Sequence, residues 1–429
     1  MGKDESLARR EEMSEGANAG LFGWFKAAPP ASRRALAAAS LGWMLDAFDV
    51  MLYALVLAYL MKDLGMTKPT AGFLGSLTLL ASAAGGVVFG VVADRKGRTW
   101  ALRASVLIYS IFTAACGLAA SVPMLAVFRV CLGLGMGGEW ASGAALVSET
   151  WPAEHRGKAL GFVQSFWAVG YAAAALVTAF VYPRLGWRAV FFIGVLPALF
   201  VFWIRAKVEE PAIWRKAKTE PAAASERVRV RTVIRGRLLG ITAAVTIMNA
   251  FTMFAYWGFN LWIPGYLSLA RDLGGIGLSP RSMPFLVAFM QVGTWLGYLS
   301  FGYISDSLGR RKTYVGFVLA AAALVLAYSA ARAPLLLLLL GPFTAFFGAG
   351  YFAGFGALTA ELYPTQIRAT LQGFTYNIGR VASAVAPLAI GSLAQTRGFG
   401  NAFILVAGAF VLAAIMWIWI PETKGRVLT

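Results

Sequence analysis

Charge is scarce in this chain of 429 residues. Asp, Glu, Lys and Arg together make up 14% of it, whereas hydrophobic residues make up 59%, and the mean hydropathy is +0.67. A water-soluble domain cannot cover its surface with so few charged side chains. The composition therefore excludes a soluble globular protein and indicates one that lies within a membrane.

Residue types that build disulfides and metal sites are almost absent. The chain has two cysteines, Cys116 and Cys131, and one histidine, His155. Both cysteines fall in apolar runs without metal-ligand spacing, so buried, unpaired thiols are expected. His155 stands in a charged loop, where a solvated side chain is expected. Nucleotide-binding loops and nucleophile motifs are also missing, so we expect no metal, no cofactor and no enzymatic activity.

Long apolar runs are what the chain has in abundance. About 20 helical residues cross a hydrocarbon core of roughly 30 Å. Twelve runs meet that length, and they lie at about 35–61, 70–93, 99–120, 123–148, 158–182, 186–205, 236–266, 282–305, 312–330, 334–360, 368–394 and 400–420. The sequence therefore predicts an all-α membrane protein with twelve transmembrane helices.

The two halves of the chain repeat each other. Gly90–Arg98 (GVVADRKGR) recurs as Gly302–Arg310 (GYISDSLGR), and Glu149–Arg156 recurs as Glu361–Arg368. Both pairs are separated by 212 residues, which indicates one duplicated unit. We therefore predict two six-helix bundles related by pseudo-two-fold symmetry, an arrangement typical of secondary transporters.

Polar segments divide the chain into five parts. The N-terminal segment, residues 1–34, has no apolar core or cleavage site, so no signal peptide is expected. The parts are an N-terminal cytoplasmic segment (1–34), the first bundle (35–205), a basic cytoplasmic linker (206–235), the second bundle (236–421) and a cytoplasmic tail (422–429).

The net charge of +18 is distributed unevenly along the chain. Lys and Arg concentrate on alternate connections, which is the positive-inside pattern and places both termini in the cytoplasm. The basic residues are therefore expected to set topology and contact membrane lipid rather than nucleic acid. We expect a monomer in a bacterial inner membrane.

Five charged residues fall deep within the apolar runs, and at the centre of a membrane each costs at least about 2.5–3.5 kcal/mol. Asp46 and Asp49 lie in the first run, Arg129 and Glu139 in the fourth, and Arg380 in the eleventh. A cost of this size makes these five residues the main functional candidates.

The first four of these charges are candidates for proton coupling. Asp46 and Asp49 are spaced i, i+3 and share one helix face. Helical rise places Asp49 and Arg129 at the same depth, so an ion pair that forms and breaks would load and release a proton. A permanent structural pair is the alternative. Glu139 lies deeper toward the cytoplasm, either as a second proton carrier or as a group that hydrogen-bonds neighbouring helix ends.

Arg380 is the candidate for substrate binding. The apolar runs of the second half hold no acid, and the planar guanidinium matches a carboxylate, so either an anionic substrate or Asp46 is its expected partner. Polar and aromatic residues at mid-membrane suit a small planar or hydroxylated ligand. They are Gln164, Trp167, Tyr256, Trp257, Asn260, Tyr351, Tyr376 and Asn377. For the aromatic residues of the seventh run, an interfacial belt is the alternative.

The repeated motifs carry acids and bases at the expected cytoplasmic face. We predict that they form ion pairs between helices that close this face and break on opening, although a purely topogenic role is the alternative. The residues are Asp94, Arg98, Glu149, Arg156, Asp306, Arg310, Glu361 and Arg368.

These motifs resemble those of the major facilitator superfamily. The resemblance rests on the Gly90–Arg98 loop, on Arg129–Glu139 with its glycines, and on Pro421–Gly425 (PETKG). Within that superfamily, Gly42–Asp49 (GWMLDAFD) is similar to the sialate/carboxylate:proton symporters. Gly379-Arg380-Val resembles niacin and organic-anion transporters.

The resemblance implies roles for particular residues. Arg380 matches an arginine implicated in anion recognition, and Asp49 with Arg129 matches the proton-coupling pair of sugar porters. The seventh run lacks the Gln-Gln and Tyr-Tyr motif of sugar porters, and the fifth lacks the glycine-proline motif of drug antiporters.

The sequence thus predicts a proton-coupled symporter of a small organic monocarboxylate, which is nicotinate-, aromatic-acid- or sialate-like and is moved by alternating access. One alternative is a sugar or polyol:proton symporter. Another is a membrane sensor or scaffold that does not transport.

Overall fold

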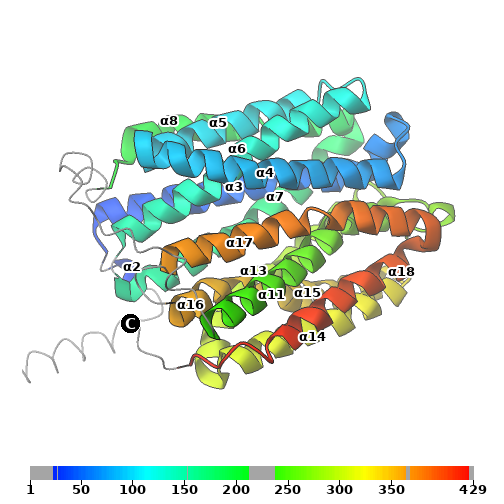
Figure 1. Cartoon of the computed structure of the whole chain (residues 1–429). Coiled ribbons are helices and arrows are strands. Elements are labelled where there is room, and N and C mark those ends of the chain that lie inside the picture. The colour runs from blue at the N-terminus through cyan, green and yellow to red at the C-terminus, as the bar shows by residue number, and fades with distance from the viewer. Residues whose placement is uncertain (1–22, 27, 152, 212–236, 364–367, 425–429) are drawn as a thin grey trace, which may run out of the picture.

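A computed structural model describes residues 23–26, 28–151, 153–211, 237–363 and 368–424. Within these ranges every regular element is a helix. Figure 1 shows the helices running side by side in two groups, one from each half of the chain. Ten helical segments among the described residues are long and apolar enough to cross a membrane. The prediction of an all-helical integral membrane protein is confirmed.

The elements of each half follow in chain order. The first half contains α2 (Gly23–Lys26), α3 (Pro30–Asp63), α4 (Lys68–Lys96), α5 (Arg98–Cys116), α6 (Val122–Thr150), α7 (Ala153–Ile193) and α8 (Pro197–Lys207). The second contains α11 (Arg237–Asn260), α12 (Ile263–Ser268), a 3₁₀ turn (Arg271–Leu273), α13 (Ser282–Leu308), α14 (Arg310–Ala330), α15 (Pro334–Gly350), α16 (Phe352–Leu362), α17 (Arg368–Ser383) and α18 (Ala386–Met416).

Two of the ten segments each hold two of the predicted runs. Gly157–Ile204 has 48 residues and Leu371–Met416 has 46, which corresponds to roughly 70 Å of helix and more than twice the hydrocarbon thickness. The helical path is interrupted at Gly186 (φ 74°) and at Gly398 (φ 79°). A positive φ is readily adopted only by glycine. These two glycines are also 212 residues apart, so the internal repeat extends to backbone geometry.

Glycine also lets helices of the first half approach closely. A Cβ atom on Gly137 of α6 would stand 2.0 Å from the Ser82 carbonyl oxygen of α4. One on Gly85 of α4 would stand 2.2 Å from the Leu134 carbonyl oxygen. Packing of this kind drives association between membrane helices. Gly90 behaves differently, because a Cβ atom there would meet nothing within 4 Å.

The two halves are joined at the end of the molecule that holds Lys68, the first residue of α4. Its ammonium group donates to the carbonyl oxygens of Leu273 (2.8 Å) and Ala394 (3.3 Å) in the second half. One turn further along α4, a Cβ atom on Gly72 would stand 2.3 Å from the Pro387 carbonyl oxygen. The boundary between the halves is therefore closed at what we call the Lys68 end.

The glycine contacts yield a test of helix packing. We expect Gly137→Ala to lower the melting temperature of the detergent-purified protein, because the added methyl group overpacks the α4–α6 contact at a cost of about 1–3 kcal/mol. Gly90→Ala is the matched control and should leave melting unchanged or raise it slightly, because alanine favours the helix. Equal destabilisation by both variants would contradict the close contact.

Candidate functional site

Three of the predicted charges meet at the boundary between the halves. Asp46 on α3 and Glu139 on α6 are each 1% exposed, and Arg380 on α17 is 4% exposed. The charge of Arg380 acts on both carboxylates. Among the described residues, however, Arg380 forms no ion pair within 4 Å with either acid. A cation of the second half thus faces two acids of the first half within a buried space.

Glycine provides the room for Glu139. A Cβ atom on Gly42 of α3 would stand 2.5 Å from Glu139 Oε1, and one on Gly143 would stand 3.4 Å from it. Glu139 Oε2 and Asp46 Oδ2 are buried and lack a hydrogen-bond partner in the part of the chain that the structure describes. Buried acceptors of this kind are rare in proteins and are typical of functional sites.

Asp49 and Arg129 are not paired in this conformation. The Arg129 guanidinium lies over the Tyr53 ring at 3.9 Å, and its Nε donates to Thr78 Oγ1 at 2.9 Å. Neither oxygen of Asp49 has a hydrogen-bond partner among the described residues. The ion pair predicted from equal depth is therefore absent here, because Arg129 contacts the side chain one turn beyond Asp49 instead.

Aromatic side chains from both halves line the charged centre. Trp43 lies 4.6 Å from Trp140, and Trp140 stacks with Tyr376 at 6.2 Å with an interplanar angle of 24°. The guanidinium of Arg380 lies 5.7 Å from the centroid of the Tyr376 ring. An aromatic surface that crosses the boundary therefore borders the cation. The sequence predictions included neither tryptophan, although Trp43 lies one turn from Asp46 and Trp140 follows Glu139.

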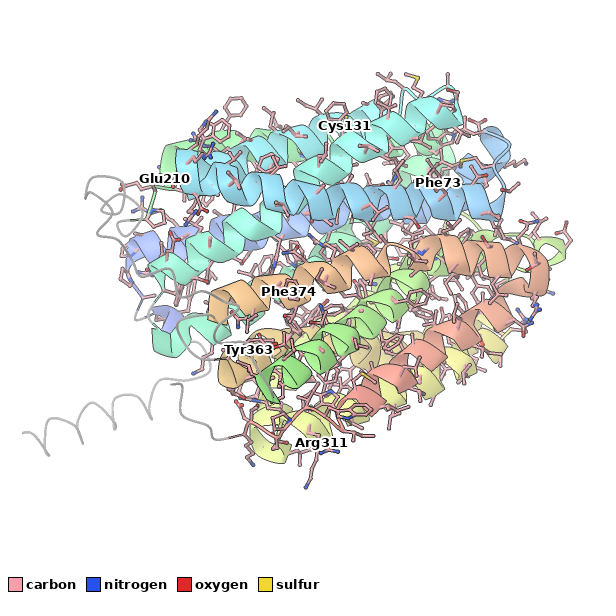
Figure 2. The ribbon with its side chains drawn as sticks, viewed as in Figure 1. Phe73, Cys131, Glu210, Arg311, Tyr363 and Phe374 are labelled. Carbon is pink, nitrogen blue, oxygen red and sulfur yellow. The ribbon has the colours of Figure 1, made fainter. Side chains whose placement is uncertain are left out.

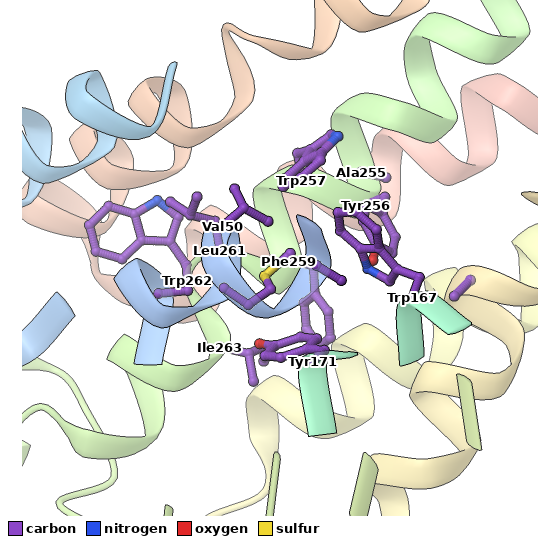
Figure 3. Close-up of a cluster of buried hydrophobic side chains, with 14 of the residues drawn as sticks. Val50, Trp167, Tyr171, Ala255, Tyr256, Trp257, Phe259, Leu261, Trp262 and Ile263 are labelled. Atoms are coloured by element: carbon purple, nitrogen blue, oxygen red, sulfur yellow. The ribbon is translucent and has the colours of Figure 1, made fainter. Parts of the chain in front are cut away.

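The aromatic surface continues on its other side. Trp43 also lies 4.8 Å from Trp167 on α7, and Trp167 makes an edge contact at 6.0 Å with Trp257 on α11. Tyr256 packs against Trp257 at 5.6 Å. Figure 3 shows Trp167, Tyr256 and Trp257 within one buried cluster. The aromatic residues predicted from the seventh run therefore line the boundary rather than an outer belt.

Other predicted site residues have their polar groups engaged elsewhere. The Tyr351 hydroxyl donates to the Thr252 carbonyl oxygen at 3.1 Å inside the second half. The side-chain amide of Asn260 donates to Tyr256 O, and that of Asn377 donates to a carbonyl on its own helix. Gln164 lies beside the Tyr298 hydroxyl. None of these four side chains makes a contact with Arg380 among those seen in the described residues.

The repeated motifs form one ion-pair network in each half. Arg98, the first residue of α5, bonds Glu149 of α6 at 2.9 Å and Asp94 near the end of α4. Arg310 bonds Glu361 at 2.8 Å and Asp306 in the same way. Each of these networks joins helices of a single half. The side chains of Arg156 and Arg368 lie outside the described residues. We call this end of the molecule the charged end.

Two further glutamates complete these networks, and the sequence predictions missed them. Glu210 accepts from the backbone N–H groups of Thr99 (3.0 Å) and Trp100 (3.1 Å) at the start of α5. Glu422 accepts from Arg310 (2.9 Å) and Arg311 (3.1 Å) at the start of α14. Each carboxylate caps a helix N-terminus, where negative charge is favourable. Figure 2 labels Glu210 and Arg311 at that end. The two glutamates are 212 residues apart, so the internal repeat could have revealed them from the sequence.

Hydrogen bonding sets the ionisation of Glu422. Partial burial opposes its charge, but backbone N–H groups of Lys424, Arg310, Arg311 and Thr423 together hold the pKa of Glu422 below its usual value. A lowered folded-state pKa contributes stability above the unfolded pKa of about 4.3, and this contribution is lost as the pH falls through the folded value.

A pH-dependent loss of stability is therefore expected for Glu422→Gln. At pH 7 the melting temperature should fall by about 1–4 °C, and the difference from the native protein should narrow below about pH 4. Scanning fluorimetry of purified protein across pH measures this. The control is Asp272→Asn, which removes an exposed acid outside the charged end. A constant difference at every pH would refute the assignment.

A repeated helical membrane scaffold with opposed charges buried at the boundary of its halves defines a membrane transporter, and its activity is transport rather than enzymatic catalysis. The chain belongs to the Major Facilitator Superfamily, whose model matches residues 39–280 and 267–428.

Relatives span nearly the whole chain. A probable 4-methylmuconolactone transporter of Cupriavidus pinatubonensis is 34% identical over 94% of both chains. A niacin transporter of Acinetobacter baylyi is 30% identical and covers 90% of this chain and 93% of its own. A sialic acid transporter of Escherichia coli is also 30% identical, with 92% and 95% covered.

Solved structures share the fold. The xylose transporter of Escherichia coli in a partially occluded, inward-open conformation superposes with a TM-score of 0.75 at 19% identity. The match covers 93% of this chain and 100% of that one.

Proposed function

We propose that the protein is a proton-coupled symporter of a small organic monocarboxylate that works by alternating access. The observation that carries the proposal is the placement of Arg380 from one half opposite Asp46 and Glu139 from the other. A substrate carboxylate bound there contacts both halves, so its binding is sensitive to their relative movement.

The topology belongs to the same proposal. Gly157–Ile204 and Leu371–Met416 are too long for single crossings and bend at glycine, which supports twelve crossings in two six-helix bundles. The charged end is then cytoplasmic by the positive-inside rule, with both termini there. We place the protein as a monomer in a bacterial inner membrane, with the bundles at 35–205 and 236–421 and the linker between them.

Arg380 has the chemistry to bind the anion. A guanidinium forms two parallel hydrogen bonds to one carboxylate, and such bonds strengthen where water is excluded. In the described residues Arg380 forms no ion pair, and its recorded neighbour is the Tyr376 ring. Its hydrogen-bonding capacity is therefore free for a substrate.

Charge balance supports coupling to a proton. With both acids ionised, Asp46, Glu139 and Arg380 carry one net negative charge. A bound monoanion would add a second negative charge to a buried site, which is unfavourable unless one acid takes up a proton. Substrate and proton therefore bind together and move together. Asp49, which is also buried, is the third acid of the proton-coupling set.

The lining favours a planar acid. Trp140 and Tyr376 present ring faces from opposite halves next to Arg380, and flat conjugated ligands stack on such surfaces. One relative is named as a niacin transporter, and niacin is a flat aromatic acid; another is named as a probable 4-methylmuconolactone transporter. The relative named for sialic acid keeps a hydroxylated acid within the range to be tested.

The closed Lys68 end sets the conformation. Because Lys68 bridges the halves at its end, substrate is proposed to enter from the charged end, and release on the opposite side requires the Lys68 contacts to break. Movement of the two bundles about the central site satisfies both requirements.

Substitution of Arg380 tests anion recognition. We expect Arg380→Ala to weaken binding of a transported acid by about 30- to 4,000-fold, because losing one partner of a buried charge pair costs about 2–5 kcal/mol. Arg380→Lys should also bind poorly, since an ammonium group cannot form the bidentate contact. The amide of the same acid should bind weakly to the native protein.

Calorimetry with matched acid and amide measures these affinities. Arg188→Ala is the control, because Arg188 pairs with Asp63 in an exposed salt bridge away from the site. Equal acid affinity in native and Arg380→Ala protein would make Arg380 structural and would favour a sugar or polyol porter.

Proteoliposome uptake tests the proposed activity itself. We expect accumulation of labelled nicotinate, benzoate, gentisate or N-acetylneuraminate when the side facing the substrate is acidic, and loss of accumulation with a protonophore. Xylose and inositol complete the panel. Uptake that requires sodium and survives the protonophore would contradict proton coupling. Binding without uptake would favour a sensor.

A further inference from the structure

Tyr109 stands where the buried acids of the first half converge. It lies on α5, is fully buried, and was not among the residues singled out from the sequence. The carboxylates of Asp46, Asp49 and Glu139 all act electrostatically on its hydroxyl. These acids come from α3 and α6. Tyr109, which comes from a third helix, is therefore a neighbour common to all three.

Recorded contacts fix the position of the Tyr109 hydroxyl. It donates to the Gly42 carbonyl oxygen of α3 at 3.5 Å. Glu139 Oε1 lies against the same glycine, 2.5 Å from where its Cβ atom would be. Asp46 follows Gly42 by one helical turn, on the same face of α3. The hydroxyl is therefore adjacent to the Asp46–Glu139 side of the site.

The same face of α5 continues toward Asp49. Thr113 lies one turn beyond Tyr109, and its hydroxyl donates to the Tyr109 carbonyl oxygen at 2.8 Å. The side chain of Asp49 faces Thr113. The backbone of Tyr109 is therefore linked to the residue that faces Asp49, while its hydroxyl lies beside the Asp46–Glu139 pair.

The hydroxyl has unused hydrogen-bonding capacity. A distance of 3.5 Å is long for an O–H···O bond, whose usual length is about 2.7–2.8 Å, and a tyrosine oxygen can also accept. Both oxygens of Asp49, Asp46 Oδ2 and Glu139 Oε2 lack partners in the described ranges. Donor and acceptors of a proton path are thus present together in a space closed to bulk water.

Further charged groups surround this cluster. Arg380 of α17 acts on Asp46 and Glu139 from the second half. Arg129 of α6 and Cys116 of α5 lie on the far side of Asp49, next to Tyr53. Arg380 therefore acts on two of the three acids, and Arg129 belongs to the neighbouring group that contains Tyr53 and Cys116.

We propose that the Tyr109 hydroxyl relays protons between Asp49 and the Asp46–Glu139 pair. In one step, a protonated carboxyl group gives its proton to the Tyr109 oxygen while the tyrosine O–H proton passes to an ionised carboxylate. One O–H bond forms on tyrosine as the other breaks, so tyrosine stays neutral. Rotation of the hydroxyl resets the relay. This inference rests on the proposed proton coupling.

Tyr109→Phe removes only the hydroxyl and tests the relay. With the panel acid that native protein accumulates fastest, nicotinate being the first probe, we expect accumulation driven by a proton gradient to fall by about 10-fold or more. Exchange of labelled for unlabelled acid at equal pH should stay within about two-fold, because no net proton transfer is needed. Binding of the acid should be unchanged.

Tyr314→Phe is the matched control. Tyr314 is also buried, and its hydroxyl makes a bond of the same length, 3.5 Å, to Thr252 Oγ1, but no carboxylate acts on it. This variant should accumulate the acid like the native protein. Equal accumulation by Tyr109→Phe would overturn the relay, and so would a parallel loss of exchange, which indicates a general structural role.

Accumulation by the native protein and a fluorinated tyrosine at position 109 distinguish failure of the relay from failure of the proposed function. If the native protein shows no proton-driven accumulation, the proposed function fails; if it does and Tyr109→Phe matches it, only the relay fails. Should Tyr109→Phe not fold, a fluorinated tyrosine at position 109 preserves the hydroxyl and lowers its pKa. The pH profile of uptake should then shift relative to the same replacement at position 314, and an unshifted profile would overturn the relay.

Discussion

Charge buried within a membrane must be balanced, and the centre of this protein is organised by that requirement. Arg380 alone in the second half and Asp46 with Glu139 in the first half would each be unfavourable without the other half beside them. Their opposition holds a cation near two acids without a direct ion pair, and under the proposed function a substrate carboxylate or a proton changes this balance. A tight ion pair at this point would leave neither group available.

The scaffold is repeated but the charges are not. At the 212-residue separation, the four first-half charges correspond to Gly258, Leu261, Gly341 and Tyr351, and Arg380 corresponds to Ala168. Repeated features instead occupy the helix ends, where Arg98 matches Arg310 and Glu210 matches Glu422. The duplicated unit therefore gives both halves equivalent ion pairs and helix caps at their ends. The proposed binding residues therefore lie where the two copies differ. Tyr351, at the position that corresponds to Glu139, is packed inside its own half.

Sequence reasoning predicted the helical class, the repeat and the buried charges because each leaves a one-dimensional mark. The hydropathy runs and the 212-residue separation can be read directly, and a charge in an apolar run is conspicuous. Helical rise gives the depth of a side chain but not the direction in which it points. Asp49 and Arg129 were matched by depth, yet Arg129 points to Tyr53. Tyr109, Trp43 and Trp140 look like ordinary core residues until their neighbours from other helices are known.

The halves are bonded to each other at the Lys68 end, whereas the ion pairs of the charged end lie within single halves, and this difference suits the proposed alternating access. At the Lys68 end the halves meet through an ammonium group and carbonyl oxygens, with no carboxylate among the recorded contacts of Lys68. When this end opens, water replaces each carbonyl, and the net free energy lost per bond is modest, about 1.5–3 kcal/mol for a charged donor. At the charged end Arg98 and Arg310 keep their acids within their own halves. The sequence predicts that these pairs break when this face opens. Pairs that lie within one half would instead stay intact in the proposed separation of the halves.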